Sequence, residues 1–127
     1  MALPVTYVLT IPATAPSFNE WRRWHWSKQE RERIGFQGLV WPLLCEKGNV
    51  CPRPLKPPVV LRAVVSRPLE RRRDSDNAGM PMWKWIQDLL VMRGYLADDT
   101  HDLVTSMPPR IVVGERAQTV VLIEEAA

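Results

Sequence analysis

The sequence predicts an α/β (α+β) fold, with helices packed on a small mixed β-sheet in the order β-α-β-α-β-β. Three observations predict it. Runs rich in β-branched residues recur along the chain, two stretches between them place apolar residues at helical spacing, and a length of 127 residues suits one domain. We therefore expect residues 1–127 to form a single domain around one core.

The first half of the chain predicts one strand and one helix. Residues 5–11, VTYVLTI, are β-branched and aromatic and predict a strand, which a proline-bounded loop follows. Ser27 and Glu30 have the spacing of a capping box and mark a helix start. Pro42 should kink or break this helix near Gly38, because its ring clashes one turn back. The apolar face of the helix comprises Phe36, Val40, Leu43 and Leu44.

The second half predicts three strands and another helix. Residues 59–66, VVLRAVVS, form the clearest strand, which we expect to be central. Pro81 suits the first position of a helix, and Gly94 suits the position just beyond its end. Residues 101–107 and 118–125 predict two further strands. The core-facing residues of this helix would be Trp85, Leu89 and Met92.

Carboxylates flank the second helix on both sides. Asp74 and Asp76, in the stretch RRRDSDN, follow the predicted central strand and project to the same side in extended geometry. Carboxylates this close repel each other unless a cation lies between them or one is protonated. Asp98 and Asp99 follow the helix, and we expect their turn to return towards the C-terminal end of the strand. A third carboxylate would then complete a hard-oxygen site for Mg²⁺.

Each half of this pattern also has a simpler explanation. DSDNAG resembles the start of an EF-hand loop, but Ala78 and Trp85 occupy the fifth and twelfth positions, where oxygen ligands belong. Asp-Asn pairs are frequent in turns, where they bond to their own backbone, and ADDTHD alone is typical of a polar turn. The two halves together are more specific than either one and favour the metal site.

Other chemistry is excluded by the sequence. No G-x-x-x-x-G-K or G-x-G-x-x-G loop occurs, which excludes nucleotide hydrolysis and dinucleotide chemistry, and His25 and His101 belong to no catalytic triad. Cys45 and Cys51 make no zinc site and are expected to be reduced intracellular thiols.

Charge and hydropathy bear on partners and location. The net charge of +3 is compatible with a polyanionic partner. We see no signal peptide and no apolar run of the roughly 18 residues that a membrane span requires, so we expect a cytoplasmic protein without membrane contact. The six tryptophans are expected to serve mainly in the core and in dimer contacts.

The order RRRDSDN, then KWIQDLLVMRGYLADD, resembles the RusA family of Holliday junction resolvases. The family pattern runs R-x-D-x-D-N, then a helix with K-x-x-x-D-x-L, a glycine and a closing D-D. PSFNEWRRWHW is also similar to the N-terminal segment of many phage and prophage relatives. The matching positions here are Arg72, Asp74, Asp76, Asn77, Lys84, Asp88, Leu90, Gly94, Asp98 and Asp99.

The resemblance implies a RusA-like, homodimeric, Mg²⁺-dependent crossover junction endodeoxyribonuclease. Such a hydrolase nicks four-way (Holliday) DNA junctions symmetrically during recombination and repair, here in the cytoplasm of a bacterial cell, phage-infected or prophage-bearing. By the same resemblance, Asp74, Asp76 and Asp99 would be catalytic and bind the metal, and Lys84 would stand where the family's helix lysine acts. The residues expected to contact DNA are Arg71, Arg72, Arg73 and Lys84.

One departure from the family pattern concerns Lys84. About two residues separate the D-N pair from the lysine in the best-known members, whereas Ala78–Trp83 intervene here. We infer a bulge at AGMP before a helix that starts near Pro81. A helix that began at Asn77 would instead displace the lysine by one turn, roughly 5 Å. Two alternatives to the enzyme remain: a junction-binding module without turnover, and a regulatory or assembly protein with solvated charge runs.

Overall fold

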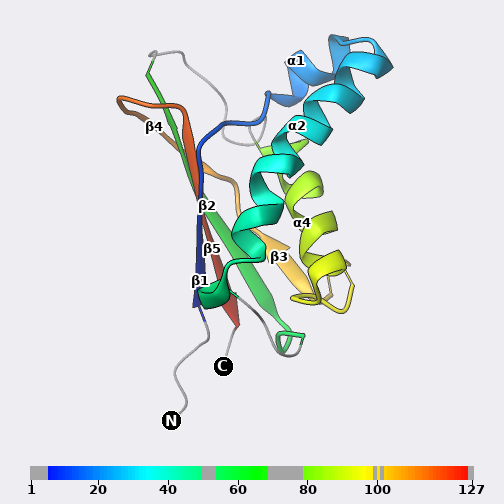
Figure 1. Cartoon of the computed structure of the whole chain (residues 1–127), viewed down its shortest axis with the longest axis vertical. Helices are drawn as coiled ribbons and strands as arrows, with labels where there is room; N and C mark the ends of the chain where they lie inside the picture. The colour runs from blue at the N-terminus through cyan, green and yellow to red at the C-terminus, as the bar shows by residue number, and fades with distance from the viewer. Residues whose placement is uncertain (1–5, 50–53, 69–78, 99, 101, 126–127) are drawn as a thin grey trace.

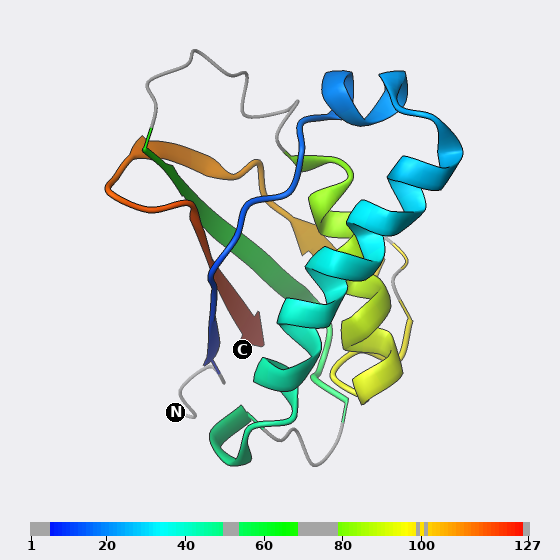
Figure 2. The ribbon, with the colours of Figure 1, turned by 45° about the horizontal axis from the view of Figure 1, so that its top comes forward.

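The computed structural model describes residues 6–49, 54–68, 79–98, 100 and 102–125. Within these residues, three α-helices pack on one face of a five-stranded mixed sheet, as Figures 1 and 2 show. The mixed α/β class predicted from the sequence is therefore confirmed. No helix in the described part of the chain is long and apolar enough to cross a membrane.

The sheet is built around β2 (Val59–Arg67). β5 (Gln118–Glu125) pairs antiparallel with one edge of β2, and β1 (Thr6–Ile11) pairs antiparallel with the far edge of β5. On the other side of β2, β3 (Val104–Ser106) pairs in parallel with its first residues and β4 (Arg110–Val113) with its last. The central position predicted for this strand is confirmed.

The predicted strands differ from the observed ones mainly in number. The first and last strands lie where the sequence predicts them, and the predicted strand 101–107 is confirmed over its central residues. β4 was not predicted, because four residues are too few to show an alternating pattern. It is held in the sheet by its parallel pairing with β2.

Side chains alternate across the strands, so one face of the sheet is buried and the other is open. On the buried face, Leu61 of β2 lies beside Ile123 of β5, and both are fully buried. On the opposite face, Val8 and Val64 are 50% and 38% exposed. The helices cover the first face only (Figure 1).

α1 (Phe18–Arg23) lies in the segment that the sequence predicted to be a loop. Ser17 is its N-cap: the Ser17 hydroxyl accepts a hydrogen bond from the Glu20 N–H at 3.3 Å and donates one to the Glu20 carboxylate at 3.2 Å. The Ser-x-x-Glu spacing of a helix start is therefore used here, ten residues before the predicted position.

α2 (Trp26–Leu44) begins before Ser27, so the predicted cap at that serine is wrong. His25 is the N-cap, and its Nδ1 accepts a hydrogen bond from the Ser27 N–H at 3.2 Å. The predicted break near Gly38 is also wrong, because Pro42 lies in the last turn and the helix continues past it. A proline so close to a helix end removes only one hydrogen bond of the ladder. As predicted, the buried face includes Phe36, Val40 and Leu44, with Leu43 partly buried beside them.

α4 (Met82–Arg93) packs beside α2 and over the sheet (Figure 2). Trp85 and Leu89 are buried as predicted, but Met92 is 73% exposed, so its assignment to the core is wrong. The buried arc centres on Ile86 and Leu90, both fully buried. Met92 falls outside this arc because two residues turn the helix by about 200°.

Both ends of α4 agree with the sequence. The helix begins at Met82, directly after Pro81, which supports a start near that proline. It ends at Gly94, whose φ of 89° is left-handed and favours glycine. The Tyr95 N–H then donates to the Leu90 carbonyl at 2.9 Å, and the buried ring of Tyr95 anchors the turn in the core.

Candidate functional site

Five residues of the predicted constellation can be placed, among them Leu90, which is fully buried on α4. Lys84 and Asp88 lie on α4, Gly94 ends that helix, and Asp98 follows in an exposed position. The other predicted site residues lie outside the described residues: Asp74, Asp76 and Asp99, and the arginines Arg71, Arg72 and Arg73. Cys51 and His101 also lie outside them, whereas Cys45 is an exposed free thiol.

Lys84 and Asp88 form an ion pair on the outer face of α4. Lys84 Nζ lies 2.9 Å from Asp88 Oδ1, one helical turn away, and the two side chains are 56% and 40% exposed. An ion pair this exposed contributes only about 0.2–1 kcal/mol to stability. The fold therefore has little need of this pair, and the lysine is presented where a phosphate can approach it.

The turn that follows α4 lies at the N-terminal end of β2. The Val59 N–H, at the start of β2, donates to the Leu103 carbonyl at 2.8 Å, and Val59 pairs with Val104. In Figure 1, the end of α4 accordingly lies beside β3, at the opposite end of β2 from β4. The expectation that this turn returns towards the C-terminal end of the strand is wrong. A helix that connects two parallel strands runs against them, so it ends where they begin.

The two predicted acidic segments flank α4 in the sequence: Asp76 lies six residues before Met82, its first residue, and Asp98 lies five residues after Arg93, its last. α4 has 12 residues and is about 18 Å long. In the described part of the chain, no group of three or more His, Cys, Asp or Glu side chains could hold a metal.

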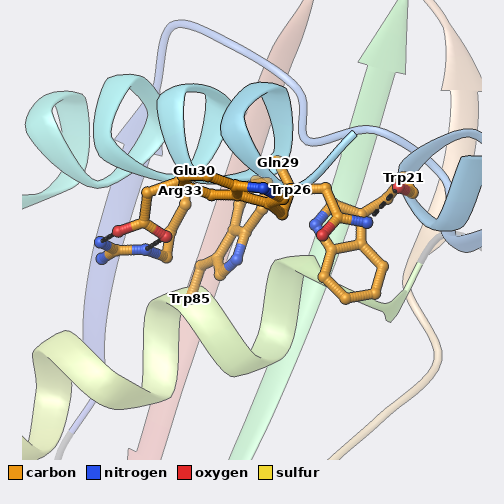
Figure 3. Close-up of a pocket in the computed structure, with 6 residues that line it drawn as sticks. All are labelled: Trp21, Trp26, Gln29, Glu30, Arg33 and Trp85. Carbon is orange, nitrogen blue, oxygen red and sulfur yellow. Dashed lines mark hydrogen bonds and ion pairs between the residues drawn. The ribbon is translucent and has the colours of Figure 1, made fainter. Parts of the chain in front are cut away.

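A second feature, which the sequence did not predict, is an aromatic pocket between the helices. It has a volume of about 420 Å³. Figure 3 shows Glu30 and Arg33 reaching from α2, and Trp85 rising from α4, into the same space. The residues that line this aromatic pocket are Trp21, Trp26, Gln29, Glu30, Arg33 and Trp85.

Hydrogen bonds fix the walls of the aromatic pocket. Gln29 Nε2 donates to the Trp21 carbonyl at 2.7 Å and so ties α2 to α1. Gln37 Nε2 donates to the Trp85 carbonyl at 2.9 Å and ties α2 to α4. Trp26 stands at the rim, where it is 71% exposed. The pocket is thus built from three helices that are held together by side-chain contacts to the backbone.

Glu30 and Arg33 form an ion pair in the wall of the pocket, in which the guanidinium donates to both carboxylate oxygens. The hydrogen bond from Arg33 holds the pKa of Glu30 below its ordinary value, and the charge of Arg33 adds to this effect. The same bond raises the pKa of Arg33, and the nearby charge of Asp88 contributes to that rise. The pair is therefore intact at neutral pH.

Further cationic side chains lie on the two helices, α1 and α2, that contribute to the pocket. Arg22, Arg23 and Arg31 are exposed on α1 and α2. The Lys28 ammonium lies 4.4 Å from the centre of the Trp24 ring, a cation–π contact. The run WRRWHW places three tryptophans and two arginines within six residues. This sequence signal could have identified the surface.

No family model matches this chain, and none of the curated proteins matches it.

Proposed function

We propose that this protein is a RusA-type crossover junction endodeoxyribonuclease, which resolves four-way DNA junctions by Mg²⁺-dependent nicking. One observation supports the proposal: the described elements flank the sequence constellation in the order strand, helix and glycine turn that the motif predicts. β2 ends at Arg67, seven residues before Asp74 and nine before Asp76. α4 then presents Lys84 on its outer face, and a left-handed glycine ends the helix before Asp98.

Each residue would have a defined role in this reaction. Asp74, Asp76 and Asp99 would hold the ion, because clustered carboxylates suit Mg²⁺ and lose their mutual repulsion on binding it. When bound, Mg²⁺ would lower the pKa of a coordinated water and stabilise charge on the phosphate. Lys84 would neutralise a phosphate oxygen in the transition state. The arginines 71–73 would contact the DNA backbone, which positions a strand without reading its sequence.

A second protomer is part of the proposal. Symmetric resolution needs two sites related by a two-fold axis, which a homodimer supplies. The geometry gives a further reason, because the turn that follows α4 lies at the N-terminal end of β2, whereas Asp74 and Asp76 follow the C-terminal end of β2 in the sequence. A partner that lies across the first protomer can place its own Asp99 beside Asp74 and Asp76. We therefore propose that each metal site draws its carboxylates from both chains.

A mobile four-way junction, incubated with and without Mg²⁺, tests the proposed activity. We expect paired nicks at symmetric positions only when the metal is present, and none when EDTA removes it. Linear duplex of the same sequence is the control and should stay intact. A gel shift of the junction without nicks under any divalent metal would instead identify a binding module.

The three arginines before Asp74 give a prediction for DNA affinity. Changing Arg71, Arg72 and Arg73 together to Ala should weaken binding to all DNA and flatten its salt dependence. The slope of log affinity against log salt should fall by up to about 0.9 for each phosphate that the variant no longer neutralises. Arg62→Ala is a matched control, because this exposed arginine lies on the open face of the sheet and contacts Glu124. An unchanged slope in the triple variant would mean that the three arginines are only solvated.

A further inference from the structure

We propose that the aromatic pocket between α1, α2 and α4 binds an unpaired nucleobase of the DNA. This inference rests on the proposed function for its choice of DNA, but it concerns residues that the metal site does not use. The pocket shares α4 with the Lys84–Asp88 pair, because Trp85, which lines the pocket, is the residue next to Lys84 on that helix. A base that leaves the stack next to the bound backbone would therefore meet these indoles.

Stacking on tryptophan is the first reason for this choice. Three indoles line the pocket, and Trp26 keeps 71% of its surface exposed at the rim. Its ring centre lies 5.5 Å from that of His25, which supports it from one side. Aromatic side chains are the general device by which proteins bind unpaired bases, because every base offers a flat π-face.

Polar groups in the pocket suit the edge of a base. The Gln29 amide nitrogen donates to the Trp21 carbonyl, which orients the Gln29 carboxamide and leaves its oxygen suited to accept a hydrogen bond from a base N–H group, including the ring N–H of thymine. The Arg33 guanidinium is held between Glu30 and Gln37. Fixed in this way, it offers a flat cationic surface on which a base can also stack.

The charge around the pocket matches a nucleic acid strand. Residues 18–33 carry five Lys or Arg and three Asp or Glu side chains, and Glu30 is already paired with Arg33. The remaining exposed arginines can contact the phosphates on either side of a captured base. The volume of about 420 Å³ lies towards the lower end of the range for small-ligand sites, as suits one planar group.

Base capture would serve the recognition of DNA shape. A duplex keeps its bases stacked, whereas the branch point of a junction interrupts the stacking, so a base there can be displaced at less cost. A pocket that takes up one base therefore favours branched or single-stranded DNA over continuous duplex without reading sequence. This role is distinct from holding the metal and from the phosphate contacts of the arginines.

The test compares two probes in EDTA, so that no cleavage occurs. One is a short oligothymidylate, and the other is an abasic strand with the same number of phosphates; fluorescence anisotropy measures both affinities. We expect the protein to bind the strand with bases more tightly, by about 5- to 150-fold for one stacked base. Trp26→Ala should remove this difference and leave the abasic affinity unchanged, and Trp26→Phe should retain most of it.

Trp41→Ala is the matched control, because Trp41 lies on the same helix, is 37% exposed and does not line the pocket. It should keep the full preference for bases. Equal affinity of the original protein for both probes would overturn the proposal. A Trp26→Ala variant that keeps the preference would also overturn it. The same holds for a Trp26→Ala variant whose affinity for the abasic strand falls as much as its affinity for the strand with bases. A change of oligomeric state in that variant, without any effect of the bases, would identify the pocket as a protein interface instead.

The two proposals fail separately. If the protein prefers strands with bases but never nicks a junction in the presence of Mg²⁺, the base-pocket proposal stands and the nuclease proposal fails. If the protein nicks junctions but binds both probes with equal affinity, the nuclease proposal stands and the base-pocket proposal fails.

Discussion

Asp76→Asn should abolish Mg²⁺-dependent cutting of a four-way junction and leave the protein folded. Asparagine keeps the shape of the side chain but removes the charge that holds a divalent cation, so cleavage should fall by orders of magnitude. Stability should change little, because relief of repulsion among the carboxylates offsets the weaker hydrogen bonding of the amide. Junction binding in EDTA should persist or tighten, since a negative charge facing phosphate is gone.

Three measurements check this expectation: circular dichroism for folding, a gel shift for junction binding, and cleavage under Mg²⁺. Asp74→Asn and Asp99→Asn should show the same separation of binding from cutting. Asp102→Asn is the control, because this exposed aspartate belongs to no part of the proposed site. A folded Asp76→Asn protein that cuts junctions at the original rate would falsify the metal assignment.

Mixing two inactive variants should restore cutting if each metal site draws on both chains. In a heterodimer of Asp76→Asn with Asp99→Asn, one composite site carries both substitutions and the other carries neither. Activity should therefore reappear from a background reduced by orders of magnitude, as single nicks rather than as paired ones. The mixture is first unfolded and refolded together so that the chains exchange.

The alternative arrangement gives the opposite result. If each site takes all three aspartates from one chain, every site in the mixture contains a substitution and the mixture stays inactive. Asp74→Asn mixed with Asp76→Asn is the matched control, because these two residues belong to the same chain of any site and should not complement. Restored cutting in that control would contradict the composite arrangement.

The elements that the sequence predicted well are determined by residues within the element itself or next to it. The left-handed φ of Gly94 and the ring of Pro81 act on their own stretch of backbone, so both ends of α4 could be predicted from single residues. β2 and β5 could likewise be predicted, because their sequences are rich in β-branched and other apolar residues, and in the fold their burial alternates with a period of two. α1 has only six residues, too few to show a period, and it depends on contacts such as that of Gln29 with the Trp21 carbonyl.

For the candidate site, the sequence identified residue types but not their positions in space. Lys84 and Asp88 are one turn apart, so their proximity on α4 follows from the helix alone. The position of the turn that carries Asp98 depends instead on which end of β2 pairs with β3. The aromatic pocket joins Trp26 to Trp85, which are far apart along the chain and meet only because α2 packs on α4.

The position of β5 has a consequence for synthesis of the chain. Among the described strands, β1 pairs with β5 alone, and β5 also supplies the long antiparallel edge of β2. β1 leaves the ribosome before β5, so β1 cannot pair in the sheet until β5 has been synthesised. Until then, the nascent chain carries strand edges and apolar side chains such as Leu9 and Leu61 without their cover, the kind of surface that chaperones bind. Emergence of residues 118–125 is the event that closes the sheet.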